Sequence, residues 1–166
     1  MKQLTRTIVT DSSYTNKLIP LDIDSENILT TLEVTNSRLN ILGESSFSNL
    51  QNLTRLVVNN NSLTWIHPFA FRHSSHLSYI SLCVNPLENL ASQLFTNQRA
   101  LRLLNLSYTL IGTIGADIVS PSTMIYSLKL DHSYILDISS DIIKLIIQLD
   151  VSNTDISSSH LYNNYV

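Results

Sequence analysis

The stretch LTRLVVNNNSLTWIHPFAFRHSSH, from Leu53 to His76, sets the pattern for the rest of the chain. Aliphatic residues occupy its first, fourth, sixth, eleventh and fourteenth positions, Asn61 the ninth and Phe71 the nineteenth. The same spacing begins again at Leu77, one residue after the stretch ends. A spacing that returns at a fixed interval indicates stacked repeats, and it is read before any single segment.

The register extends in both directions from this stretch. Repeats begin at residues 29, 53, 77, 101 and 125, each 24 residues after the last, and all five aliphatic positions in each hold Leu, Ile or Val. A sixth begins early, at Ile146, after only 21 residues. The missing residues fall where Phe47, Phe71 and Phe95 stand in earlier repeats, so the back of that coil is expected to be shorter and to lack the aromatic.

The two ends of the chain differ in how well they fit the register. Residues 1–28 fit poorly, because Thr10 takes a position that is aliphatic elsewhere, although Ile8, Leu18 and Ile23 match. We expect 1–28 to be either a degenerate first repeat or a lead-in, and 29–166 to be the repeat array.

The spacing predicts the fold. In each repeat, positions three to seven form a short strand whose fourth and sixth side chains point inward by alternation. No coil can bury its apolar side alone, so neighbours stack into a parallel sheet along the inner face of a curved solenoid. Amphipathic helices are excluded because L-x-x-L-x-L mixes spacings of three and two. The fold class is therefore an α/β repeat solenoid with a concave parallel sheet and an irregular or short-helical convex side.

The ninth position of every repeat carries a small polar residue. Such a side chain can bond the backbone of adjacent coils, and a scaffolding role follows rather than a functional one. The residues are Ser37, Asn61, Asn85, Thr109, Ser133 and Thr154.

Residues 29–156 resemble the typical class of leucine-rich repeat found in Toll-like receptors, relaxin-type receptors and other extracellular receptor arms. The phrases LTWIHPFAF (63–71) and LRLLNLSYTLI (101–111) carry the resemblance most clearly. It implies a horseshoe segment, but not a particular partner, because binding sites are grafted onto a generic scaffold. The chain departs from the family in its Ser- and Thr-rich ninth position, its shortened fifth repeat and its lack of cysteine caps. The chain has one cysteine, Cys83, which cannot form an internal disulfide. This is expected either of a protein in a reducing compartment or of a piece of a longer repeat array.

The register also predicts which side chains line the concave face, at positions three, five and seven of each strand. This set mixes charge, one aromatic and an apolar middle, which suits protein or peptide contact. The alternative is a merely solubilising surface. The candidate ligand-binding residues are Glu33, Arg55, Val57, Asn59, Tyr79, Leu103, Asn105, Lys129, Asp131 and Asp150.

Metal and cofactor sites are not predicted. His73 and His76 lie three residues apart, but no Cys or carboxylate is spaced to complete a tetrahedral site. Gly112 and Gly115 lack the Lys-Ser/Thr of a phosphate loop. Only 14% of residues are charged and the net charge is −3, so there is no basic surplus for nucleic acid.

Catalysis is not predicted either. Asp131, His132 and Ser133 are consecutive, and consecutive residues of a strand are not expected to face one another as a triad does. Cys83 falls on the concave face with no base nearby, so it is expected to be an unreactive thiol. Trp65 is read as either a contact residue or a packing residue.

The remaining signals concern location. Sequons at Asn52, Asn60 and Asn105 are candidate glycosylation sites, and a glycan on Asn105 would lie on the concave face. No segment is long and apolar enough to span a membrane. The leading hypothesis is a non-catalytic module that binds protein or peptide, part of a cell-surface receptor ectodomain. The alternative is a cytoplasmic scaffold or substrate-recognition protein, supported by the lone cysteine and the lack of a convincing signal peptide. The sequence does not indicate an oligomeric state.

Overall fold

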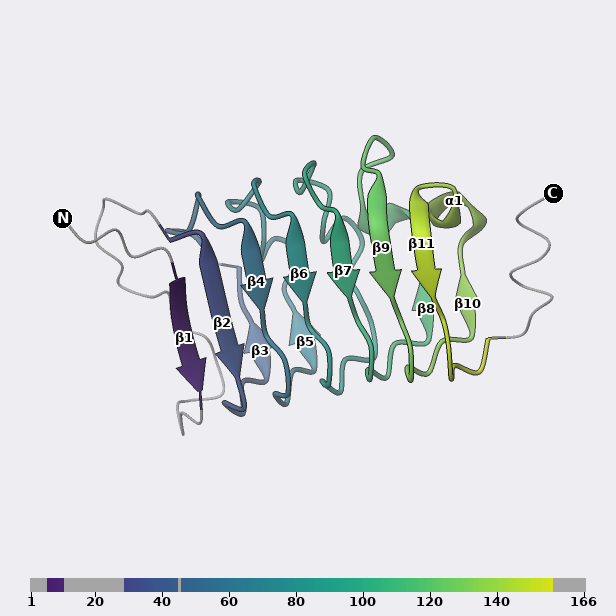
Figure 1. Cartoon of the computed structure of the whole chain (residues 1–166), viewed down its shortest axis with the longest axis horizontal. Helices are drawn as coiled ribbons and strands as arrows, with labels where there is room; N and C mark the ends of the chain where they lie inside the picture. The colour runs from purple at the N-terminus through teal and green to yellow at the C-terminus, as the bar shows by residue number, and fades with distance from the viewer. Residues whose placement is uncertain (1–5, 11–28, 45, 157–166) are drawn as a thin grey trace.

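In the part of the chain that the structure describes, seven parallel strands lie side by side and form one face of an elongated array (Figure 1). The computed structural model describes residues 6–10, 29–44 and 46–156. The strands occur in the sheet in the order β1-β2-β4-β6-β7-β9-β11, so each joins the sheet next to the one before it. Their bounds are β1 Arg6–Thr10, β2 Thr31–Thr35, β4 Arg55–Val57, β6 Tyr79–Ser81, β7 Leu103–Asn105, β9 Ile125–Lys129 and β11 Ile146–Asp150.

Shorter elements form the opposite, convex side. Among the described residues, two pairs of parallel two-residue strands lie there, β3 with β5 and β8 with β10, together with one 3-10 turn and one short α-helix. Their bounds are β3 Ile41–Leu42, β5 Trp65–Ile66, β8 Thr113–Ile114, β10 Asp137–Ile138, η1 Ala116–Ile118 and α1 Ser140–Ile143. The predicted fold class, a parallel-sheet solenoid with an irregular convex side, is confirmed.

The strand register reproduces the sequence period. Thr31 pairs with Arg55, Arg55 with Tyr79, Tyr79 with Leu103 and Leu103 with Ser127, each a step of 24 residues. The last pairing, of Ser127 with Gln148, has a step of 21 and absorbs the shortened repeat.

The first strand departs from the expected register by one residue. Arg6 pairs with Thr31, a step of 25, so Val9 lies opposite Val34 and Thr10 opposite Thr35. The expectations that Thr10 takes an aliphatic position and that Ile8 matches the pattern are therefore wrong, because the extra residue places Val9 opposite Val34 and Ile8 opposite Glu33. Most of 1–28 and all of 157–166 lie outside the described residues, so the domain limits stay predictions.

The aliphatic positions of the five regular repeats form the core. All of them are at most 3% exposed except Leu90, which is half-buried and packs against the rest. In the shortened coil, Ile142 and Ile143 of α1 are buried where earlier repeats place a phenylalanine. The short back without an aromatic, expected from the sequence, is present.

The ninth-position residues of the central coils join neighbouring coils, as the pattern predicts, while Ser37 and Thr154 donate to carbonyls of their own coils. The Asn85 side chain accepts from the Leu63 amide at 3.0 Å and donates to Val58 O at 2.7 Å and Leu82 O at 2.8 Å. In later coils hydroxyl groups take over, and both Thr109 Oγ1 and Ser133 Oγ donate to Leu106 O at 2.8 Å. These bonds hold each strand end at a fixed place, and so position the concave face.

Candidate binding site on the concave face

The N-terminal half of the concave face carries a connected group of three candidates on adjacent strands. Arg55 Nε lies 3.7 Å from Glu33 Oε1, and the Arg55 guanidinium carbon lies 3.7 Å from the centre of the Tyr79 ring. Arg55 and Tyr79 are paired residues of β4 and β6, which explains why the guanidinium lies over the ring. The ion pair and the cation–π contact hold a charged and an aromatic group half-exposed at one place on the sheet.

The apolar middle of the face is less open than the register suggests. Leu103 is half-buried, but Val57 is only 6% exposed. Val57 is paired between Glu33 and Ser81, so neighbours on both sides cover its short side chain. Val57 was expected to offer contact surface, and its burial corrects that expectation.

Asn59 has a structural partner as well as an exposed edge. Its side-chain oxygen accepts from Ser81 Oγ at 2.8 Å and from the Cys83 amide at 3.1 Å. Asn59 therefore joins the end of its own strand to the next strand. A ligand at this position would contact the side-chain nitrogen of Asn59.

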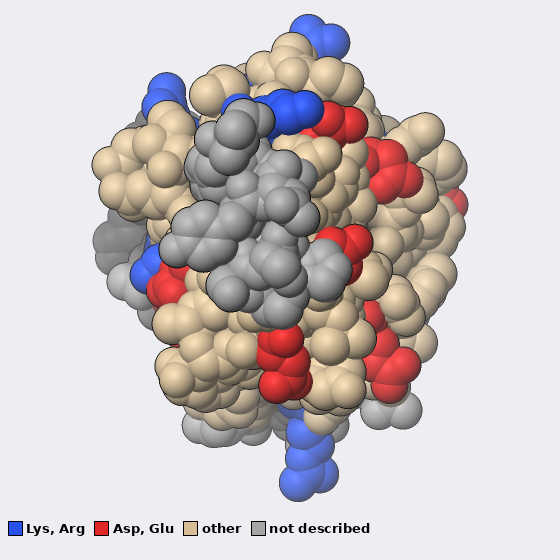
Figure 2. All heavy atoms as spheres, turned by 90° about the vertical axis from the view of Figure 1, so that its right-hand side faces the viewer, with Lys and Arg blue, Asp and Glu red and all other residues tan. Residues whose placement is uncertain are grey.

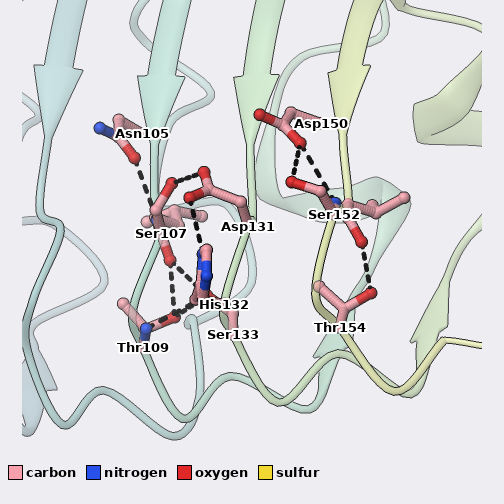
Figure 3. A network of polar contacts seen from close by, with 11 residues as sticks. Asn105, Ser107, Thr109, Asp131, His132, Ser133, Asp150, Ser152 and Thr154 are labelled. Atoms are coloured by element: carbon pink, nitrogen blue, oxygen red, sulfur yellow. Dashed lines mark hydrogen bonds and ion pairs between the residues drawn. The ribbon is translucent and has the colours of Figure 1, made fainter.

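The C-terminal half of the face is polar and organised around Asp131 (Figure 3). Ser107 Oγ donates to Asp131 Oδ1, and His132 Nδ1 lies 3.2 Å from Asp131 Oδ2. His132 stacks in turn on Tyr108, with ring centres 4.4 Å apart and planes at 5°. One carboxylate is thus held between two coils.

These contacts determine the direction in which the pKa of Asp131 is shifted. Partial burial by itself raises the pKa of the carboxyl, but the hydrogen bonds from Ser107, His132 and the Asp131 backbone, together with the positive charge of His132, outweigh it. The net result is a pKa below the ordinary value, so Asp131 is a carboxylate at neutral pH.

Three further candidates form one row across this half. Asn105, Lys129 and Asp150 are paired residues of β7, β9 and β11. Asn105 Oδ1 accepts from the Ser107 amide at 3.0 Å, and Asp150 Oδ1 accepts from the Ser152 amide at 3.1 Å and from Ser152 Oγ at 2.7 Å (Figure 3). Lys129 is exposed, so the row presents both signs of charge to solvent.

The expectation that Asp131, His132 and Ser133 do not face one another is wrong for the first two residues. Asp131 and His132 do face one another, because His132 has a left-handed backbone (φ 55°) and has left the strand. Ser133 still does not join them: it is buried, and its hydroxyl bonds Leu106 O and the Thr109 amide. The three side chains therefore do not form a nucleophile–base arrangement.

Four other residues were considered from the sequence as contact, thiol or metal-binding residues. The Cys83 thiol is half-buried, and burial raises its pKa, which disfavours the reactive thiolate. Trp65 is 47% exposed on β5, so it is not a core packing residue. His73 Nε2 accepts from Arg72 Nε at 2.8 Å, and His76 Nδ1 lies 3.0 Å from Gln51 O. Among the described residues no three His, Cys, Asp or Glu gather as metal ligands would.

The three sequons differ in setting. Asn52 and Asn60 are exposed, whereas Asn105 is half-buried in the concave row. Their glycosylation stays a prediction. No helix in the described ranges has the length and hydropathy to cross a membrane.

Sequence reasoning missed a second row of exposed residues, at the edge where the strands end. The eighth residue of every repeat has a left-handed φ between 51° and 57°. We call these residues the edge row: Asn36, Asn60, Val84, Tyr108, His132 and Asn153. The signal in the sequence was the change from Asn to Val84 and Tyr108 at a position where Asn is the favoured residue.

Charge is dispersed over the C-terminal end of the array. Figure 2 views that end and shows carboxylates and a few Lys or Arg side chains spread among uncharged atoms. The described part of this surface has no continuous basic area of the kind that tracks a phosphate backbone.

Comparisons with known proteins agree with the repeat pattern and the fold. The leucine-rich repeat family profile matches residues 27–87. No curated protein matches the chain. Many solved chains do, among them Toll from Drosophila in its glycosylated complex with Spatzle, at 23% identity and a TM-score of 0.78, over 89% of this chain and 21% of that one.

Two other solved complexes are similar at the same level. The LRIM1/APL1C complex matches at 20% identity and a TM-score of 0.78, over 90% of this chain and 27% of that one. The TLR13–ssRNA13 complex matches at 22% identity and a TM-score of 0.67, over 95% and 25%. The chain thus spans about a quarter or less of the length of these structures, and the likeness concerns the fold. The 24-residue register, the ninth-position bonds and these matches together show that the chain has a leucine-rich repeat fold.

Proposed function

We propose that this chain is a non-catalytic binding module that recognises a protein or peptide through its concave face. The observation that carries the proposal is the Glu33–Arg55–Tyr79 group, in which Arg and Tyr lie half-exposed on adjacent strands. Arg and Tyr are enriched among the residues that dominate binding energy at protein interfaces. Their contacts fix both side chains before a partner arrives, so less entropy is lost on binding.

The setting we propose is a receptor-type ectodomain at the cell surface. The support is the likeness to Toll in its complex with Spatzle and to the LRIM1/APL1C complex, in which the partner is a protein. The similar TLR13 complex holds RNA, but the mixed charges here favour a protein partner over a phosphate backbone.

A peptide selection tests the concave face without knowledge of the natural ligand. Dodecapeptides are selected from a random phage-displayed library against the chain, and their affinities are measured by biolayer interferometry. We expect Arg55→Ala and Tyr79→Ala each to weaken the dominant peptides about tenfold or more, equivalent to roughly 1.4 kcal/mol.

The matched control is Arg99→Ala, which removes the same charge from an exposed side chain in the loop before Leu101. It should leave peptide affinity within about twofold. Thermal midpoints of all variants are measured alongside. Selected peptides that tolerate both concave substitutions would contradict the proposed site.

Glycan occupancy separates the cell-surface setting from the cytoplasmic alternative. Peptides that cover Asn52, Asn60 and Asn105 are analysed by mass spectrometry in protein from its natural source. A glycan on any of them supports the ectodomain, and three unmodified sites would favour the cytoplasmic scaffold.

A further inference from the structure

The edge row contains two residues that its backbone conformation disfavours. A left-handed φ suits Asn, and the row uses Asn at 36, 60 and 153. Val84 (φ 57°) and Tyr108 (φ 56°) adopt the same conformation, which is a genuine outlier for a β-branched residue. At two consecutive repeats the chain therefore carries a residue that the left-handed conformation disfavours.

The same two residues are exposed and line a hollow. Val84 is 43% exposed, Tyr108 52% and their neighbour Leu110 51%. With Pro86 they form the apolar walls of an open hollow of about 300 Å³, whose lining also includes Asn60, Asn61 and Asn85. Strain, exposure and concavity thus coincide at one place on the edge of the array. Strained backbone of this kind concentrates at functional sites.

We propose that this hollow is a second interaction site, which receives an aromatic side chain from a protein partner. It goes beyond the concave site, since none of its lining residues is among the concave candidates. Its volume of about 300 Å³ lies at the lower limit of roughly 300–1,000 Å³ for ligand sites, which is room for one aromatic side chain.

Charge and ring geometry specify the occupant further. None of the lining residues carries a charge, so no side chain there would pair with a charged guest. The exposed Tyr108 ring and Pro86 offer flat faces to a ring, which aromatic groups prefer in offset or edge-to-face packing. A neutral aromatic residue fits these surfaces best.

The probe is N-acetyl-phenylalaninamide, titrated into isotopically labelled protein made without glycans and followed by NMR. The proposal predicts saturable shifts of the Val84, Tyr108 and Leu110 resonances, and much weaker effects from N-acetyl-alaninamide. Val84→Asn and Tyr108→Asn should each weaken the probe at least tenfold. Phe69→Ser, which removes an exposed ring outside the hollow, should leave probe affinity unchanged.

Stability distinguishes loss of the site from loss of the fold. Val84→Asn relieves the left-handed valine, so its thermal midpoint should rise by about 2 °C even as probe binding is lost. The reverse change in the same row, Asn153→Val, should lower the midpoint and leave the probe bound. A second variant, Leu110→Ser, should weaken the probe without moving the midpoint.

Three results would overturn the proposal. They are shifts that do not saturate or that map elsewhere, equal binding of the alanine probe, and concentration-dependent broadening of the edge resonances in the absence of probe. The last would show that a second copy of the chain covers the hollow.

Discussion

Asn85 illustrates how one buried side chain joins two coils. Its oxygen satisfies the Leu63 amide of the preceding coil, while its nitrogen donates to carbonyls of both coils. At the next two repeats Thr109 and Ser133 divide this task between two hydroxyls, which are 3.2 Å apart and both donate to Leu106 O. A hydroxyl has a single donor, so two residues replace one amide.

Replacing Asn85 should therefore destabilise the chain more than replacing an exposed asparagine. Asn85→Ala leaves a buried amide and carbonyls without partners, at an expected cost of about 2–4 kcal/mol. Asn89→Ala, at an exposed position in the same repeat, should change the free energy of unfolding by less than about 0.5 kcal/mol. Urea denaturation measures both, and equal losses would refute the bonding role of Asn85.

The Asp131 carboxylate predicts a pH dependence of stability. Its folded pKa is lowered from an unfolded value of about 3.9, so it stabilises the fold above about pH 4 and loses that effect as pH falls through the folded pKa. Asp131→Asn should flatten the decline of unfolding free energy below about pH 4. Asp137→Asn, an exposed control, should keep the decline, and a wild-type slope in Asp131→Asn would contradict the assignment.

At the scale of elements, three stacked phenylalanines organise the convex side. Phe47 and Phe71 have ring centres 5.5 Å apart, and Phe71 and Phe95 5.4 Å, with nearly parallel planes. The stack ends where Val119 takes the position, and α1 then closes the shortened coil with Ile142 and Ile143.

The stack gives a matched pair of variants. Phe71 is fully buried between two rings, whereas Phe69, two residues earlier, is 48% exposed. Phe71→Ala should cost about 3–5 kcal/mol and Phe69→Ala less than about 1 kcal/mol, measured by chemical denaturation. Similar costs would mean that the aromatic positions are not a continuous core.

At the scale of the whole molecule, every coil depends on its neighbours. Each strand between β1 and β11 pairs with the strand before and the strand after, so one unfolded central coil exposes the apolar sides of two others. A destabilising substitution in one coil should therefore lower the stability of the whole array and not of that coil alone.

A buried charge tests this dependence. Leu106 is fully buried, so the carboxylate of Leu106→Asp would lie in the core without an opposite charge. We expect this substitution to destabilise the array by several kcal/mol. Lys129→Ala, on the exposed face, should leave folding almost unchanged. Circular dichroism melts compare them, and similar midpoints would show that the register is wrong.

Much of this architecture was predictable, because a 24-residue period assigns inward and outward positions by geometry alone. The period placed Leu106 in the core and Arg55 on the concave face, as observed. It could not show that Arg55 stacks on Tyr79, since that depends on rotamers. Nor could it show the Asp131–His132 contact or the hollow beside Val84, because both follow from the left-handed residue that ends each strand.

Hydroxyl-radical footprinting of the chain with and without a selected peptide shows which surface the peptide covers. Tyr79 lies on the concave face and Tyr108 on the edge row, so one chemistry reports on both surfaces. We expect the peptide to lower oxidation of Tyr79 and to leave oxidation of Tyr108 and Tyr134 unchanged. Unaltered oxidation of Tyr79, with protection confined to Tyr108, would contradict binding through the concave face.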